Sequence, residues 1–231
     1  RIDGKRILKD FPAIYEFYYD DPNGKYKSTH RTPVSHVKCK SSTDFYKELK
    51  IHNNKKIYES DFNPVFRFLS ENYKDVDSPT LHTAFFDIET DFCQERGYAP
   101  TSDPFNQITA ISLYLNWLDK LICLVIAPST LTQTEANDIV NGFEEDVILF
   151  NTEVEMVEAF FLLIDDADVL SGWNSEAYDI PYQVNRVTKI MNKNATRKFC
   201  LWNKLPKKRT FERYGKEQQT YDLVGRIHMD Y

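Results

Sequence analysis

Cysteine pairs, long apolar runs and a signal sequence are all missing from this chain of 231 residues. The four cysteines are scattered and form no C-x-x-C pair, which argues against a zinc knuckle or a secreted disulfide framework and favours a reducing compartment. The longest apolar run, residues 121–127, has seven residues, whereas crossing a bilayer takes roughly 20. We therefore expect no membrane insertion. Because the chain begins at Arg1 without a signal-peptide pattern, we also expect a piece of a longer protein.

Basic residues are missing from one long stretch and concentrated in the next. The net charge of −6 argues against a protein that coats nucleic acid by bulk charge. Residues 121–185 contain no Lys or Arg and 13 Asp or Glu, whereas residues 186–216 contain 11 Lys or Arg and one Glu. The basic stretch is either a solvated face or a surface that tracks phosphates while bases stack on its aromatic rings. Those rings are Phe199, Trp202, Phe211 and Tyr214.

The length predicts one large domain or one domain with a partial companion, at roughly 150 residues per domain. Asp, Ser and Pro cluster at residues 75–79, which indicates a soft boundary near residue 80. Before it, aromatic strand-like pieces alternate with polar turns, and the Asp-Asp-Pro-Asn-Gly segment at residues 20–24 predicts a β-hairpin. Residues 1–80 are therefore predicted to form a small α+β domain.

Regular hydrophobic patterning begins after residue 80. Residues 82–90, 108–116 and 120–127 have the composition of three strands in an antiparallel meander. Thr152 and Glu155 have capping-box spacing, which predicts a helix that runs to about Ile164. A short strand at residues 169–170 and a helix from about Pro181 should follow. This order predicts a layered α/β domain with a mixed sheet.

Two carboxylates stand in the first of these strands. Asp87 and Glu89 are two residues apart, so their side chains project from one face while Phe86 and Ile88 face the other way. On a central apolar strand, both can ionise only if a cation offsets their repulsion; otherwise the pKa of one group rises. Oxygen ligands suit Mg²⁺ or Mn²⁺, which catalyse phosphoryl chemistry as a pair of ions. The alternative is a chance D-x-E triplet with two exposed edge acids.

A third carboxylate, Asp179, precedes Ile180 and Pro181 at the start of the second predicted helix. Asp is a preferred N-cap residue and Pro is favoured in the first helical turn, so Asp179 is a candidate cap. A carboxylate at the C-terminal edge of a sheet is also well placed to meet a metal that Asp87 holds. One residue can serve both purposes.

The segments F86-D-I-E-T90 and N174-S-E-A-Y-D179 resemble the first and second exonuclease motifs of family B DNA polymerases. Residues 59–73, 103–112 and 169–187 are similar to the replicative polymerases of T-even-type tailed phages. The resemblance implies an RNase H-like 3′→5′ exonuclease domain at residues 81–231, preceded by part of the polymerase N-terminal domain at residues 1–80. It implies proofreading of 3′-terminal nucleotides by two-metal hydrolysis during phage DNA replication, in the cytoplasm of an infected bacterium. Implied partners are primer-template DNA, the rest of the polymerase chain, a sliding clamp and other replisome proteins.

The resemblance also assigns roles to residues. Asp87 is expected to bridge two divalent ions, Mg²⁺ or Mn²⁺, Glu89 to ligate the ion that activates water, and Asp179 to assist the second ion. The positions that match residues holding the 3′-terminal nucleotides are Thr90, Asn174 and Tyr178. Residues 211–220 resemble a β-hairpin that separates primer from template. Its candidate DNA contacts are Arg213, Tyr214 and Lys216.

One motif of the family, Y-x-x-x-D, is absent. Gln218 stands four residues before Asp222, and Arg226 stands four residues before Asp230. In the family, the Asp of this motif completes the metal site, so we expect an incomplete metal site and weak or no exonuclease activity of this chain by itself. Polymerase motifs are absent as well. The alternative function is a binding module, because the N-terminal part of related phage polymerases can bind RNA. In that case residues 1–80 and the basic stretch bind RNA without catalysis.

Overall fold

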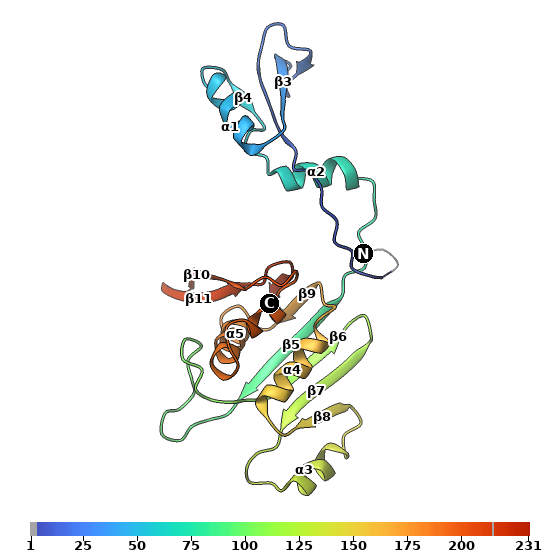
Figure 1. The fold of residues 1–231 in the computed structure, drawn as a ribbon, viewed down its shortest axis with the longest axis vertical. Coiled ribbons are helices and arrows are strands. Elements are labelled where there is room, and N and C mark those ends of the chain that lie inside the picture. The colour runs from blue at the N-terminus through green and yellow to red at the C-terminus, as the bar shows by residue number, and fades with distance from the viewer. Residues whose placement is uncertain (1–3, 214) are drawn as a thin grey trace. The chain divides into compact units, whose positions relative to one another are not determined.

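The computed structural model describes residues 4–213 and 215–231, apart from the side chains of Arg213 and Lys216. The chain divides into two compact units, Arg1–Pro79 and Thr80–Tyr231 (Figure 1). Tyr214 and the two side chains just named lie outside the described residues, so the predicted DNA contacts at these three positions stay predictions. Within the described residues, no helix is both long and apolar enough to span a membrane.

The first unit contains an antiparallel four-stranded sheet in the order β2-β3-β1-β4. The strands are β1 (Tyr15–Asp20), β2 (Tyr26–Lys27), β3 (Pro33–Cys39) and β4 (Ile57–Tyr58), and the helices are α1 (Ser42–Ile51) and α2 (Pro64–Tyr73). Ser41 caps α1 by accepting a hydrogen bond from the backbone of Asp44 at 3.1 Å. The core of this unit includes Phe17, Val34 and Phe45, all buried. Residues 4–79 thus form an α+β unit.

The hairpin predicted at residues 20–24 is wrong. The segment does turn, and the Gly24 N–H donates to the Asp21 carbonyl at 2.8 Å. However, β1 pairs with β3 along its length and with β4 on its other edge, so β2 adds to the far side of β3. Gly24 lies directly on β3, where a Cβ atom would come within 2.3 Å of the Val34 carbonyl carbon. The turn therefore carries the chain across to β3.

The second unit is built on a six-stranded mixed sheet in the order β12-β9-β5-β6-β7-β8. Its strands are β5 (Thr83–Thr90), β6 (Ile108–Leu115), β7 (Lys120–Ile126), β8 (Asp146–Phe150), β9 (Val169–Gly172) and β12 (Ile227–Asp230). Strands β5, β6 and β7 form the predicted antiparallel meander, whereas β9 runs parallel to β5, β12 parallel to β9, and β8 parallel to β7. The predicted α/β class with a mixed sheet is confirmed.

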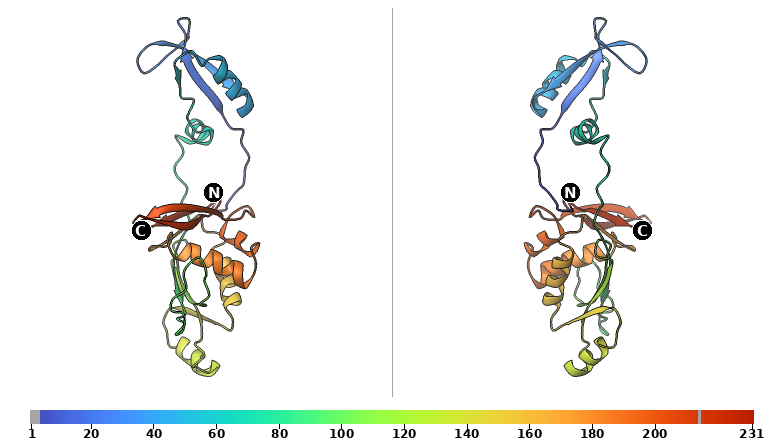
Figure 2. Two further views of the ribbon diagram at one scale, coloured as in Figure 1. Left: turned by 90° about the vertical axis from the view of Figure 1, so that its left-hand side faces the viewer. Right: turned by 90° about the vertical axis from the view of Figure 1, so that its right-hand side faces the viewer.

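Helices α4 (Glu153–Leu163) and α5 (Asp179–Ile190) lie on the same side of this sheet (Figure 2). The predicted capping box of α4 is present: the Thr152 hydroxyl accepts the Glu155 N–H at 3.2 Å, and the Glu155 carboxylate accepts the Thr152 N–H at 3.1 Å. Phe86 of β5 and Phe160 of α4 are buried with their ring centroids 6.2 Å apart. Burial of these apolar groups holds the two layers together.

Four elements of this unit were not predicted from the sequence. They are α3 (Gln133–Val140), strand β8, a short 3₁₀ helix η1 (Ala195–Phe199) and strand β12. Phe199 of η1 is fully buried, with its ring centroid 4.9 Å from that of Phe161. It cannot stack on a base, so this part of the predicted phosphate-tracking surface is wrong. The reason is that η1 places the Phe199 side chain in the hydrophobic core of the second unit, although neighbouring residues of the basic stretch are exposed.

Strands β10 (Lys207–Arg213) and β11 (Lys216–Asp222) form an antiparallel hairpin. The Tyr221 hydroxyl of β11 donates to Asn185 Oδ1 of α5 at 2.6 Å. Arg209 of β10 pairs with Asp222 at 2.6 Å and also with Glu176, in the loop before α5. Side-chain contacts therefore attach the hairpin to α5 and to the preceding loop.

Candidate active site

Strand β5 presents its two acids on the sheet face that α4 does not cover. Phe86 and Ile88 are buried in the core beneath α4, whereas Asp87 and Glu89 are exposed. The alternation follows from the two-residue period of a strand. Although β5 is the third strand of six, its acid-bearing face is open.

Asp179 approaches β5 from the start of α5. Its Oδ1 atom accepts a hydrogen bond from the Ile88 N–H, at 3.1 Å. Strand β9 pairs with β5 only as far as Phe85, and the next residue of β9, Gly172, is its last. A buried backbone N–H needs an acceptor, and Asp179 provides one where β9 has ended. The N-cap residue of α5 is Tyr178, so the prediction that Asp179 caps this helix is wrong.

Gly172 explains how β9 comes so close to β5 at this point. A Cβ atom there would lie 2.6 Å from the Phe86 carbonyl oxygen, so no larger residue fits without moving the strands. The chain then turns through Asn174, whose φ of +53° is in the left-handed region that Asn tolerates better than most residues. The Asn174 carbonyl accepts the Tyr178 N–H at 3.1 Å. This turn places Tyr178 and Asp179 next to β5.

The environment of Asp179 changes its protonation. The residue is 3% exposed, and burial, followed by the negative charge of Asp87, raises the pKa of its carboxyl group to about 7. The hydrogen bond from Ile88 acts in the opposite direction, and Asp230 at the end of β12 adds a further rise. The structure thus brings Asp179 and Asp87, from the two sequence motifs, into electrostatic contact. A nearby cation would favour the charged form of both groups.

The oxygen donors of this site suit a hard divalent cation. Asp87 and Glu89 share the open face of β5, and burial, followed by the negative charge of Asp87, raises the pKa of Asp179. Carboxylates in this arrangement match the preference of Mg²⁺ and Mn²⁺ for oxygen ligands. Across residues 4–213 and 215–231, no three His, Cys, Asp or Glu side chains already converge as a metal centre. The donor chemistry therefore fits a cation, whereas a complete ligand set is not preformed.

Two of the predicted substrate-binding residues lie together. Thr90 Oγ1 and the Tyr178 hydroxyl are 3.2 Å apart, so the end of β5 and the start of α5 are linked beside the acids. Tyr178 and Asn174 line a polar pocket of about 620 Å³. Its other walls include Thr101 of the loop after β5, Asn185 of α5 and residues 217–219 of β11. Thr90 does not line this pocket.

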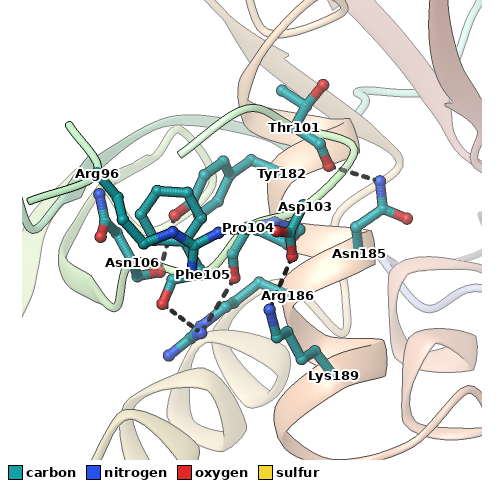
Figure 3. Close-up of polar contacts among 10 residues, drawn as sticks. All are labelled: Arg96, Thr101, Asp103, Pro104, Phe105, Asn106, Tyr182, Asn185, Arg186 and Lys189. Carbon is teal, nitrogen blue, oxygen red and sulfur yellow. Dashed lines mark hydrogen bonds and ion pairs between the residues drawn. The ribbon is translucent and has the colours of Figure 1, made fainter. Parts of the chain in front are cut away.

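The loop between β5 and β6 is held against α5 by buried polar contacts (Figure 3). Tyr182, which is fully buried, donates to the Asn106 carbonyl at 2.7 Å. Arg186 donates to the carbonyls of Pro104 and Phe105 at 3.1 and 3.2 Å. Since residues 104–106 lie just before β6, these bonds fix the end of the loop that leads into that strand.

Arg186 also forms a two-point ion pair with Glu153 of α4, at 2.8 Å from Nε and 2.6 Å from Nη2. Glu153 is buried, and its Oε1 atom accepts the Ile108 N–H at 2.9 Å. The fork geometry of a guanidinium matches a carboxylate in this way. The pair therefore connects α5, α4 and the first residue of β6.

Asn185 connects both walls of the polar pocket. Its Nδ2 atom donates to the Thr101 carbonyl at 2.8 Å, and its Oδ1 atom accepts from the Tyr221 hydroxyl at 2.6 Å. Sequence reasoning did not identify Asn185, Arg186 or Glu153 as members of a network. No local pattern reveals them, because their partners lie between 33 and 84 residues away along the chain.

Comparison with known proteins identifies the family of this chain. The family model for DNA polymerase family B, exonuclease domain, matches residues 29–231. The DNA polymerase of Bombyx mori nuclear polyhedrosis virus is 28% identical over 173 residues, or 69% of this chain and 16% of that protein. The DNA polymerase of Orgyia pseudotsugata multicapsid polyhedrosis virus is 26% identical over 170 residues, or 70% of this chain and 16% of that protein.

The DNA polymerase catalytic subunit of Saimiriine herpesvirus 2 (strain 11) is 26% identical over 119 residues, or 49% of this chain and 11% of that protein. The chain spans about a sixth or less of the length of these relatives. They come from baculoviruses and a herpesvirus, so they give no support to the T-even phage part of the expectation, which stays a prediction. Because the family model covers most of its length, the chain belongs to the exonuclease-domain family of family B DNA polymerases.

Proposed function

We propose that the second unit hydrolyses the 3′-terminal nucleotides of DNA, as the proofreading 3′→5′ exonuclease of a DNA polymerase. The observation that carries this proposal is the bond between Asp179 and the Ile88 N–H, which brings the second motif onto the strand of Asp87 and Glu89. The proposed catalytic and metal-binding residues are Asp87, Glu89 and Asp179.

In this proposal Asp87, Glu89 and Asp179 hold two divalent ions, Mg²⁺ or Mn²⁺. Such ions, when bound, stabilise the negative charge that develops on the phosphoryl oxygens. Asp179 is held in place by Ile88 before any ligand arrives, so little reorganisation is required of it.

The substrate in this proposal is a single-stranded 3′ end of primer-template DNA. Thr90 and Tyr178 offer hydroxyl groups to sugar or phosphate, Asn174 offers an amide, and the Tyr178 ring offers a face for stacking. The polar pocket of about 620 Å³ falls within the common range of ligand sites, roughly 300–1,000 Å³. Its size and polarity are compatible with a nucleotide.

We extend the proposal to the context of the whole protein. The β5–β6–β7 meander followed by β9 and β12 parallel to β5 supports an RNase H-like fold. Three further parts of the proposal rest on the sequence resemblance alone. Residues 1–80 are part of the polymerase N-terminal domain, the partners are a sliding clamp and replisome proteins, and the host is an infected bacterium. The missing Y-x-x-x-D motif supports weak hydrolysis by these 231 residues on their own.

Degradation of a 5′-labelled single-stranded DNA tests the activity. With protein in excess and Mn²⁺ or Mg²⁺ present, we expect a ladder of products shortened from the 3′ end. Asp87→Asn should abolish the ladder, whereas Glu158→Gln, a change at an exposed acid of α4, should leave it intact. Binding of Mn²⁺, followed by its electron paramagnetic resonance signal, gives a second readout that slow hydrolysis does not obscure. Internal cleavage, or Mn²⁺ binding equal in wild type and Asp87→Asn, would contradict the proposal.

A second candidate function is RNA binding by the first unit, without catalysis. A pocket of about 460 Å³ in this unit is lined by Tyr18, Tyr26, Lys27 and Tyr58, among others. Tyr26 is 51% exposed, and aromatic rings beside lysines suit stacked bases and phosphates. Tyr26→Ala should weaken retention of a labelled single-stranded RNA, whereas Tyr46→Ala, an exposed tyrosine on α1, and Asp87→Asn should not. Equal retention by all variants would oppose this candidate.

A further inference from the structure

An apolar pocket of about 480 Å³ lies between α3 and strands β7 and β8. Figure 1 shows α3 beside β8, which is the edge strand opposite β12 in the strand order of the sheet. The strands contribute Cys123 and Val125 from β7 and Val147 from β8, and the helical side contributes Ile139 and Phe143. Nearly every lining group is hydrocarbon, so water in this pocket finds few hydrogen-bonding partners.

The pocket opens on the sheet face that α4 leaves uncovered. Asp87, Ser112, Cys123 and Val147 are paired across β5, β6, β7 and β8 in one row, and paired residues project from the same face of a sheet. Ser112, Cys123 and Val147 line the pocket, whereas Asp87 does not. The pocket shares no lining residue with the polar pocket beside α5 and is separate from it.

Helix α3 covers this face only in part. Of its eight residues only Ala136 is buried, whereas Ile139 and the nearby Phe143 are 51% and 55% exposed. Two large apolar side chains at the rim of an apolar pocket form a patch that a further surface would bury favourably.

The surroundings of the pocket carry negative charge. Residues 121–185 contain 13 Asp or Glu and no Lys or Arg. Glu145 lines the pocket, and Asp138 and Glu144, which are adjacent in sequence to the lining residues Ile139 and Phe143, are exposed. This charge repels phosphate groups, and thereby nucleic acid and anionic lipid surfaces, whereas it attracts cationic groups.

We propose that this pocket binds a segment of another protein that combines large apolar side chains with flanking Lys or Arg residues. The apolar side chains fill the space between Ile139, Phe143 and the strands. The basic residues meet Asp138, Glu144 and Glu145 at the rim. The acids favour such a segment over a neutral small molecule, since that ligand would leave the charged rim unused. This inference is independent of the proposed nuclease activity.

Selection from a displayed library of random 12-residue peptides tests the proposal on the whole chain. We expect enriched sequences that join apolar residues, aromatic or aliphatic, with Lys or Arg. A synthetic copy of one such peptide should bind at least tenfold more weakly to Ile139→Ser. Leu162→Ser provides the matched control, because Leu162 is 77% exposed on α4 and is not part of the pocket. Binding to Leu162→Ser should equal that of wild type, with thermal melting curves confirming that both variants fold.

Two further readouts locate the peptide and test the charge. Bound peptide should slow alkylation of Cys123, which lines the pocket, and should not change alkylation of Cys39 in the first unit. The double change Asp138→Asn and Glu145→Gln, and added salt, should each weaken binding several-fold. The proposal is overturned by the absence of enriched peptides, by enrichment of acidic or uncharged peptides, by unchanged binding to Ile139→Ser, or by an apolar dye that binds where no peptide does.

Discussion

Helices α5 and α3 pack on the same sheet by different means. Helix α5 carries Tyr182, Asn185 and Arg186, and each of these bonds to segments remote in sequence. Helix α3 buries only one residue, Ala136, its capping box bonds lie within its own first turn, and it borders an apolar pocket. Reactive groups need fixed positions, and Asp179, one of the three residues proposed to act in catalysis, is the first residue of the heavily bonded helix. The loosely packed helix instead leaves apolar surface open.

The largest effect is expected from Arg186→Ala. This change leaves Glu153 buried without its ionic partner, a loss that typically costs about 3–5 kcal/mol. We expect the free energy of unfolding of the second unit, measured with urea, to fall by that order. Lys189→Ala is the control, because its ion pair with Asp103 is about half exposed on both sides and such pairs contribute about 0–1 kcal/mol. Similar losses for the two variants would remove the distinction between buried and surface contacts on α5.

A pH-dependent effect is expected from Asp179 when divalent ions are chelated. Its folded-state pKa of about 7 lies above the ordinary value of 3.8, so folding favours the protonated form. The stabilisation is complete below about pH 4 and is lost as pH rises through 7, with a loss on the order of 2–4 kcal/mol. Asp179→Asn should flatten this part of the curve of unfolding free energy against pH. If the unfolding free energy of the variant fell by the same amount over this pH range, the titrating group would be another residue.

Tyr182→Phe is expected to have a smaller effect. It removes the hydroxyl that donates to the Asn106 carbonyl, and an unsatisfied buried acceptor costs about 1–3 kcal/mol. Urea unfolding measures the loss. Tyr114→Phe offers a control, because the Tyr114 hydroxyl bonds to Asp119 at an exposed position and its removal should change stability much less. Equal effects would mean that the loop is held without help from Tyr182.

The smallest effect is expected from Ile139→Ser on α3. The side chain is half exposed, so the change should cost about 1 kcal/mol or less. The same substitution on α5, Ile180→Ser, removes a fully buried side chain and should cost about 3 kcal/mol or more, since it adds a buried hydroxyl to a cavity. Comparable losses for the two isoleucines would show that α3 is packed as tightly as α5.

Local patterns predicted the elements that depend on nearby residues. The capping box of α4 and the meander of β5, β6 and β7 follow from spacing and alternation, and the structure contains both. The two acids of β5 share one face for the same reason. The turn at residues 20–24 misled the sequence analysis, because strand pairing in the first unit depends on β3 and β4, which lie later in the chain. A local turn sequence does not reveal that both edges of β1 are paired with strands that lie later in the chain.

The candidate site was predicted in part. The D-x-E triplet and Asp179 were identified, and the structure brings Asp179 to Ile88, inside that triplet. From the sequence, a raised pKa was expected within the Asp87–Glu89 pair unless a cation is bound, whereas in the structure the raised pKa is that of Asp179. The difference arises because Asp179 is buried whereas Asp87 and Glu89 are exposed. Asp179 can occupy its buried position beside β5 because strand β9 ends at Gly172. The basic stretch was similarly ambiguous, because Arg186, Lys189 and Arg209 bond to acids of the same chain.

The two hydrogen bonds of Asn185 attach two different walls of the polar pocket to α5. The amide nitrogen holds the Thr101 carbonyl and the amide oxygen holds the Tyr221 hydroxyl, so the orientation of the amide is fixed by its partners. Asn185→Asp would keep an acceptor for Tyr221 and remove the donor for Thr101, and Tyr221→Phe would release only the hairpin strand. One wall of the pocket can thus be released by substitution while the other stays attached to α5.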